Sequence, residues 1–152
     1  MRTRKQTGFT LVEILIVVVI LGILAAIVVP QFTNASNEAI KGALQSQLQT
    51  IESQFELYRV RNQGAEPPNF GTAANNNGWD ELLDGEYLKE EPFNSYTSSG
   101  IIEAGTEANA IADTRASGRG WLFEVDANGN YQFYASGYDE TNNLLEHEQP
   151  AP

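Results

Sequence analysis

The stretch Gly8–Val29 reads GFTLVEILIVVVILGILAAIVV, and the interpretation of the whole chain depends on it. After Gly8 the run is apolar except for Thr10, Glu13 and the small residue Gly22. In a helix rising about 1.5 Å per residue, roughly 20 residues cross the ~30 Å hydrocarbon core of a bilayer. The run is therefore long enough to form a transmembrane helix.

Charges around the apolar run predict its orientation. Three basic residues, Arg2, Arg4 and Lys5, precede it, and every acidic residue follows Gly8. The positive-inside rule then predicts a single-pass protein of the inner membrane, with a cytoplasmic N-terminus and residues 31–152 on the far side. A cleaved secretory signal fits poorly, because its apolar core spans ~7–15 residues and ends in a small-x-small site. A plain signal anchor and a more specialised segment remain as interpretations.

Glu13 favours the specialised interpretation. A carboxylate within a bilayer costs roughly 2.5–3.5 kcal/mol on insertion scales, and a simple anchor has no use for it. Buried acids are usually matched by a charge or a hydrogen-bond donor. Lys5 and Arg4 could reach only part of the way toward it. Glu13 is therefore either an acid tolerated near the membrane interface or one whose partner comes from a neighbouring subunit.

The residues Gly8-Phe9-Thr10-Leu11-Val12-Glu13-Ile14, together with the basic leader and the apolar run, resemble the processing motif of type IV prepilins and type II secretion pseudopilins. The resemblance implies that a prepilin peptidase cuts between Gly8 and Phe9 and that the new amino group of Phe9 is N-methylated. It also implies that Glu13 faces the Phe9 amine of the adjoining subunit during assembly. Two opposite charges in a low-dielectric core attract strongly, although desolvation cancels much of the gain. The pair would then mainly set the register between subunits.

Two residues of the first helical segment bear on its flexibility. Pro30 removes a backbone hydrogen bond, and Gly22 weakens a helix by roughly 1 kcal/mol. Both are also common in ordinary transmembrane helices. The family resemblance implies that the stretch Gly22–Pro30 loses helical order on assembly, so that the filament can stretch.

The helix is predicted to continue beyond the membrane. Apolar residues recur at spacings of three and four, which indicates an amphipathic helix with one buried stripe: Ile40, Leu44, Leu48, Ile51, Phe55 and Tyr58. Gly64 and Pro67-Pro68 follow as stop signals. One helix from about Phe9 to Asn62 would be roughly 80 Å long. A coiled-coil seam is the alternative, but the heptad pattern lasts barely three repeats.

The remainder predicts a small sheet packed on that stripe. Alternating aromatic and polar residues on either side of Asn128-Gly129 indicate a hairpin within 121–136. Shorter signals indicate a helix within Trp79–Leu88 and strands at Ile101-Ile102 and Ala110-Ile111. The loop Pro92–Tyr96 resembles the proline–asparagine–aromatic loop that precedes the sheet in this family, with Ser95 in place of the second proline.

The predicted fold class is therefore α+β and pilin-like: a long N-terminal helix, membrane-spanning in its first half, packed against a small antiparallel β-sheet. We divide the chain into five parts by these patterns. They are a leader (1–8), a transmembrane and filament-core helix half (9–30), an amphipathic helix half (31–63), an α+β head (64–138) and an acidic, loose tail (139–152).

Catalytic patterns are missing from the sequence. It holds one histidine, His147, and no cysteine, glycine-rich phosphate loop or HExxH motif. An enzymatic activity is therefore not expected. Asp126, Asn128 and Asn130 match the start of a calcium loop, but the pattern then fails and a hairpin explains them better. The family resemblance points to a second weak calcium candidate in the C-terminal loop: Asp139, Glu140 and Asn142. No other cofactor is expected.

Charge narrows the range of partners. The chain carries 9 Lys+Arg and 20 Asp+Glu, a net charge of −11. Without residues 1–8 the net charge would be −14, a surface that repels phosphate backbones, so no nucleic-acid partner is expected. The partners implied by the resemblance are membrane lipid before assembly, the prepilin peptidase, an inner-membrane assembly platform and further copies of this chain.

The predicted function is a structural subunit of a type IV pilus-like filament, processed by prepilin peptidase, polymerised through its N-terminal helix and displayed outside the inner membrane. Two alternatives stay open. One is the major pseudopilin of a type II secretion system. By the family resemblance, the lack of a C-terminal disulfide loop points toward such a pseudopilin or toward a minimal pilin, without deciding between them. The other is a membrane-tethered binding module that never polymerises. We slightly favour the pilus subunit, because the calcium loop is degraded.

Overall fold

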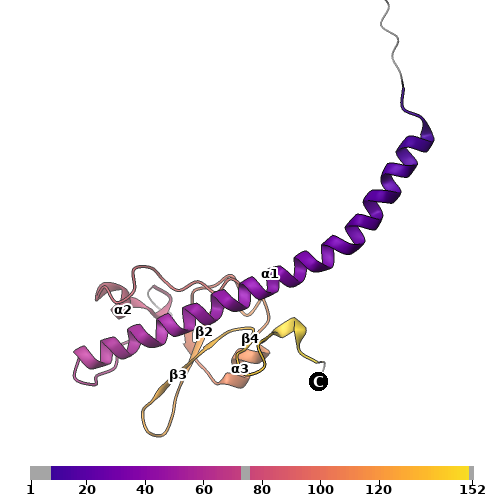
Figure 1. Ribbon diagram of the computed structural model, residues 1–152. Coiled ribbons are helices and arrows are strands. Elements are labelled where there is room, and N and C mark those ends of the chain that lie inside the picture. Colours follow the sequence, from indigo (N-terminus) through magenta and orange to yellow (C-terminus); the bar gives the residue numbers. More distant parts are fainter. Residues whose placement is uncertain (1–7, 73–75, 151–152) are drawn as a thin grey trace, which may run out of the picture. The chain divides into compact units, whose positions relative to one another are not determined.

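A computed structural model describes residues 8–72 and 76–150 (Figure 1). The chain divides into two compact units, residues 1–37 and 38–152. The second unit holds the sheets, the shorter helices and the buried core, and we call it the head.

Helix α1 spans Leu11–Arg61, which confirms the predicted long helix to within two residues at its start and one at its end. Thr10 precedes the helix, and its side chain caps the first turn. The helix ends where Gln63 and Gly64 adopt left-handed backbone angles, with φ of 58° and 85°. The amide of Gly64 donates to the carbonyl of Arg59 at 2.7 Å and closes the last turn.

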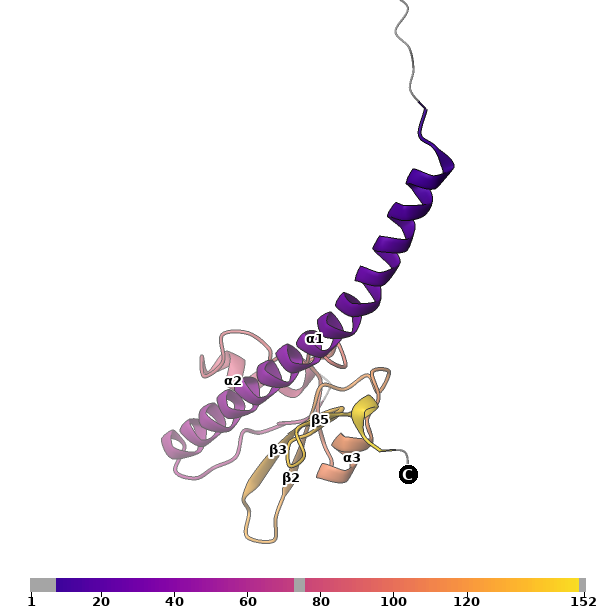
Figure 2. The same cartoon turned by 45° about the vertical axis from the view of Figure 1, so that its right-hand side comes forward.

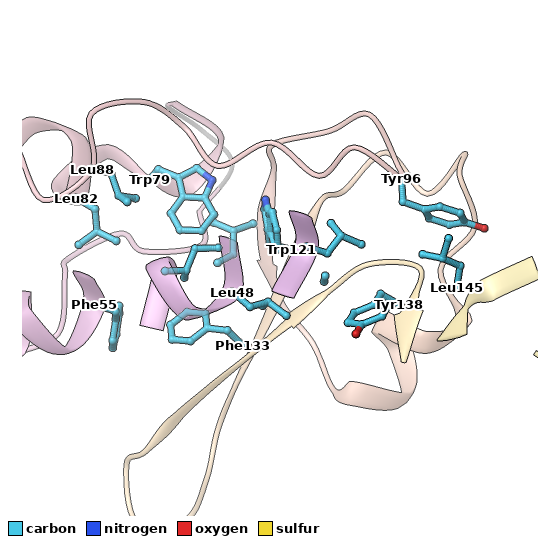
Figure 3. Close-up of a cluster of buried hydrophobic side chains, with 14 residues drawn as sticks. Leu48, Phe55, Trp79, Leu82, Leu88, Tyr96, Trp121, Phe133, Tyr138 and Leu145 are labelled. Atoms are coloured by element: carbon cyan, nitrogen blue, oxygen red, sulfur yellow. The ribbon is translucent and has the colours of Figure 1, made fainter. Parts of the chain in front are cut away.

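The head is built on one face of α1, and the predicted stripe is confirmed. Leu44, Leu48, Ile51 and Phe55 are at most 2% exposed. The ring of Phe55 lies 4.5–5.1 Å from the ring centroids of Phe70, Tyr131 and Phe133. Figure 3 shows Leu48 and Phe55 of the helix near the aromatic side chain of Phe133 from the sheet. Tilted and edge-on rings at such distances pack favourably, so the sheet is held on the helix mainly by aromatic contacts.

The main sheet has three strands in the order β1 (Ile102–Ala104), β2 (Trp121–Val125) and β3 (Tyr131–Ala135). Strands β2 and β3 form the predicted antiparallel hairpin, in which Phe123 lies opposite Phe133. Strand β1, however, runs parallel to β2, so the sheet is mixed and not purely antiparallel. Two parallel neighbours need a crossover connection, and helix α3 (Glu107–Ala112) provides it.

Helix α3 corrects one prediction. Ala110-Ile111 was expected in a strand but lies inside this helix. Thr106 and Asn109 form a reciprocal capping box at its start, with the Asn109 amide donating to Thr106 Oγ1 at 3.3 Å. This local polar cap outweighs the short apolar pair that suggested a strand. The predicted short helix after Trp79 is confirmed as α2 (Asp80–Asp84), preceded by the 3-10 turn η1 (Asn76–Gly78).

Asn94 holds the long loop between α2 and β1 against the sheet. Its fully buried amide donates to the carbonyls of Gly120 (2.7 Å) and Ser136 (3.0 Å). Its carbonyl oxygen accepts from the backbone amides of Tyr96 (2.8 Å) and Thr97 (3.1 Å). The asparagine of the loop Pro92–Tyr96 is thus a polar junction of the head.

The C-terminal segment corrects another prediction. We expected a loose tail from Asp139 onward, but strands β4 (Tyr138–Asp139) and β5 (Leu144–Leu145) pair antiparallel and the 3-10 turn η2 (Glu146–Glu148) follows. Leu145 is fully buried, because it joins the core that contains Leu44 and Leu48. Two adjacent leucines in a polar context carry too little periodicity to predict a strand. Figures 1 and 2 both show this segment beside α3.

Candidate assembly site

Glu13 and Thr10 form a capping box at the start of α1. The Thr10 amide and the Thr10 hydroxyl each donate to Glu13 Oε2 at 2.8 Å. In return, the Glu13 amide donates to Thr10 Oγ1 at 3.3 Å. The acid therefore lies where the positive end of the helix dipole favours a negative charge.

This geometry gives Glu13 a hydrogen-bond partner within its own subunit and leaves one carboxylate oxygen for a second partner. Both hydrogen bonds from Thr10 end on Oε2, and within the described part of the chain no donor reaches Oε1. Each bond to the charged oxygen offsets some of the cost of holding it in an apolar setting. The arrangement can accept a cation from outside the subunit without first breaking the cap.

Apolar side chains surround this site on every side of the helix. Large hydrophobic residues from Phe9 to Phe32 are between 51% and 83% exposed. Helices that are apolar all round occur in membranes or inside assemblies. By length and composition, α1 qualifies as a membrane-spanning helix, and none of its most apolar window is buried within the described residues. The first unit thus offers an apolar surface that only lipid or another chain would cover.

The predicted cleavage point lies just outside the helix. Gly8, Phe9 and Thr10 are exposed and have no helical structure. A peptide bond in such a segment is accessible to a peptidase, since no helical hydrogen bonds have to be broken. Residues 1–7 of the predicted leader lie outside the described residues.

Helix α1 runs without a break through Gly22 and Pro30. Pro30 offers no amide to the ladder, and the Thr33 hydroxyl bonds the carbonyl of Val29 at 3.1 Å one turn away. The loss of helical order implied by the resemblance concerns the assembled filament and stays a prediction.

The first calcium candidate is organised as a turn. Asp126 Oδ1 accepts from the backbone amides of Asn128 (2.8 Å) and Asn130 (2.9 Å) between β2 and β3. Hydrogen bonds from the backbone and side chain of Asn130 lower the pKa of Asp126, ahead of those from Asn128. The carboxylate is thus engaged in closing the hairpin, as the sequence indicated.

The second calcium candidate has one carboxylate already in use. Asp139 accepts from the Asn142 amide at 2.9 Å through Oδ1 and from the Asn142 side chain at 2.8 Å through Oδ2. Asn142 therefore points donors at the oxygens that would bind a cation, while Glu140 is exposed. Among residues 8–72 and 76–150, no three His, Cys, Asp or Glu side chains gather closely enough to hold a metal ion.

The sequence did not lead us to the structural roles of two residues, Thr10 and Lys41. Thr10 was noted only as a polar exception, although the spacing of Thr10 and Glu13 is the signature of a capping box and could have revealed its role. Lys41 was not singled out at all, yet only 6% of it is exposed. Its partners come from the C-terminal segment and from its own helix, and the distant one could not be read from local spacing.

Comparison with known proteins finds similarity in the same N-terminal region. Residues 3–29 match the family described as the prokaryotic N-terminal methylation motif. The type II secretion system core protein G of Pseudomonas aeruginosa is 44% identical over 62 residues, which cover 41% of this chain and 44% of that relative. Proteins of the same name from Dickeya chrysanthemi (44% over 59 residues; 39% of each chain) and Vibrio cholerae (41% over 61 residues; 40% and 42%) are also similar.

These alignments span about two fifths of the relatives, and no solved structure matches the chain. The family match to residues 3–29 includes the capping box of Thr10 and Glu13 and most of the exposed apolar segment of α1. The N-terminal segment of this chain thus carries the prokaryotic N-terminal methylation motif and is similar to type II secretion system core proteins G.

Proposed function

We propose that this chain is the major pseudopilin of a type II secretion system, a structural subunit without catalytic activity. The observation that carries the proposal is the 44% identity over 62 residues to a core protein G. Our slight preference for a pilus subunit gives way here, because the relatives favour the pseudopilin alternative.

The first proposed step is processing. A prepilin peptidase cuts the exposed bond between Gly8 and Phe9 on the cytoplasmic side, and the new amino group of Phe9 is methylated. The amide and hydroxyl of Thr10 lie beyond the cut, so the capping box around Glu13 survives it. The mature N-terminus then places a cation at the end of an apolar helix.

The second proposed step is assembly. Glu13 Oε1 receives the Phe9 amine of a neighbouring subunit, while Oε2 stays bonded to Thr10. The apolar surface of the first unit leaves membrane lipid, with the help of an inner-membrane assembly platform, and packs against copies of itself. The far side of the membrane, and hence the resulting filament, is periplasmic, with the acidic head outside the filament core.

The test substitutes Glu13 in the native host. Glu13→Ala should leave cleavage intact but reduce filament yield on the order of a hundredfold, because a buried amine left without its partner costs about 3 kcal/mol. Glu38→Gln, an exposed acid on the same helix, is the matched control and should assemble normally. Mass spectrometry reports the N-terminus, and filaments recovered from the periplasm report assembly. Normal filaments from Glu13→Ala would rule out the proposed pairing.

A second arm separates secretion from pilus assembly. The chain is expressed in cells that have only a type II secretion machinery and in cells that have only a type IV pilus machinery. We expect processed filaments in the first and few in the second. Assembly by the pilus machinery alone would return the balance to the pilus subunit, and processing without filaments in either would indicate a tethered module.

A further inference from the structure

We define the C-terminal strap as Tyr138–Gln149. Contacts with the rest of the head stabilise the strap more than contacts within it do. Its two strands are two residues long each, too short for an independently stable hairpin. It follows Gly137, which has a φ of 78° that favours glycine. The strap is visible as the yellow end of the ribbon in Figure 2.

One lysine ties the strap to α1 by charge. Lys41 Nζ lies 2.9 Å from a carboxylate oxygen of Glu148 and 2.9 Å from one of Glu38. The Lys41 side chain is 7% exposed and that of Glu148 is 24%, whereas Glu38 is 66% exposed. Because shielding from water strengthens an ion pair, the ion pair of Lys41 with Glu148 is stronger than its ion pair with Glu38.

The same carboxylate also shapes the strap internally. Glu148 Oε2, the oxygen facing Lys41, accepts from the backbone amide of Leu145 at 3.0 Å. Leu145 is the fully buried residue of the strap. The ion pair and the burial of this leucine are therefore linked through one oxygen atom.

Further hydrogen bonds complete the attachment. Gln45, one turn after Lys41, donates to the Tyr138 hydroxyl at 2.7 Å. The Tyr96 hydroxyl donates to Glu146 Oε2 at 3.1 Å. The Glu146 amide bonds the carbonyl of Gly137 at 2.9 Å and closes the strap at its base. These bonds leave the pair of β2 and β3 untouched, since that hairpin has its own ladder.

We propose that the C-terminal strap is a releasable cover, locked onto α1 by the Lys41–Glu148 ion pair, that opens about Gly137 while the hairpin of β2 and β3 stays packed. The device does not depend on the proposed function. In small domains, parts with few apolar anchors open at lower free energy than the core. Opening presents Tyr138 and Leu145, which are buried in the closed state.

The experiment measures hydrogen exchange by mass spectrometry on the full chain in detergent micelles. Lys41→Met keeps the apolar stem and removes the charge, while Glu148→Gln keeps an acceptor for the Leu145 amide. Each should accelerate exchange in peptides from the strap about tenfold, the equivalent of roughly 1.4 kcal/mol, with peptides from 121–135 unchanged. Glu38→Gln is the control and should change strap exchange by less than about threefold.

Each other outcome counts against the proposal. Unchanged strap exchange in Lys41→Met and Glu148→Gln would show that the ion pair is not the lock. Equal acceleration of peptides from 121–135 would show that the strap does not open separately. An effect of Glu38→Gln as large as that of Glu148→Gln would confine the role of Lys41 to its own helix.

Discussion

The two parts of α1 belong to different units and differ in how their apolar side chains are distributed around the helix. Before residue 38, consecutive residues such as Val18, Val19 and Ile20 are all about half exposed, whichever way they point. After it, Leu44, Leu48 and Phe55 are buried while the intervening positions are mostly exposed. An all-round apolar surface cannot be covered by one small domain, whereas a single stripe can. The apolar stripe of the second part is covered by its own head, whereas the apolar surface of the first part is exposed.

The largest expected effect comes from shortening a large apolar side chain in the head, compared with one in the first unit. Phe55→Ala should lower the free energy of unfolding of the head by about 3–5 kcal/mol, because it leaves a cavity among the surrounding rings. Val18→Ala should leave head stability unchanged, since Val18 is exposed in the first unit. Denaturant titration of the full chain in detergent, followed by tryptophan fluorescence, measures both. Equal losses would mean that the two regions are not energetically separate.

The next effect tests whether polar contacts matter as much as apolar ones within the head. In the wild type, the Asn94 side chain pairs with two backbone carbonyls and two backbone amides. Asn94→Ala leaves these groups without that partner and should lower the free energy of unfolding of the head by about 3 kcal/mol. Asn142→Ala, at an exposed turn, is the control and should cost less than about 1 kcal/mol. The same titration would contradict the role of Asn94 if the two variants unfolded alike.

Alkaline pH should weaken the head by a smaller amount. Burial, followed by a hydrogen bond to Glu66, raises the pKa of Tyr131 from 10.0 to about 12. The unfolded chain therefore loses this proton first, and the free energy of unfolding falls between pH 10 and about pH 12. The raised pKa of Lys41 acts in the same direction.

Unfolding midpoints measured from pH 9 to pH 11 should decline, and less steeply in Tyr131→Phe, which has no hydroxyl to titrate. An identical decline in that variant would exclude Tyr131 as a contributor.

The smallest effect concerns the first turn of α1, where Thr10 and Glu13 form the capping box. Thr10→Val removes the capping hydroxyl but keeps the shape, and should cost about 1 kcal/mol of local helix stability. Amide exchange over Leu11–Glu13 in micelles should rise about fivefold. Thr33→Val, whose hydroxyl bonds a carbonyl inside the helix, is the control and should leave that turn unaffected. Unchanged exchange at the first turn would contradict the capping role.

Much of the fold and part of the site were predictable from local patterns. The stripe from Leu44 to Phe55 and the turn at Asn128-Gly129 encode the amphipathic helix and the hairpin within a few residues of chain. Glu13 was identifiable because an acid in an apolar run has a known cost. Features that depend on residues far apart were missed: the parallel pairing of β1 with β2 and the contact of Lys41 with Glu148.

The sequence by itself determined that this chain has an apolar N-terminal helix with one acid, an amphipathic continuation and a hairpin, because each is written in the spacing of neighbouring residues. Only the tertiary structure decided that Asn94 joins a loop to the sheet and that Leu145 closes the core. Such contacts link residues more than 40 positions apart, as from Asn94 to Ser136, and their energy exists only once other elements have brought the partners together.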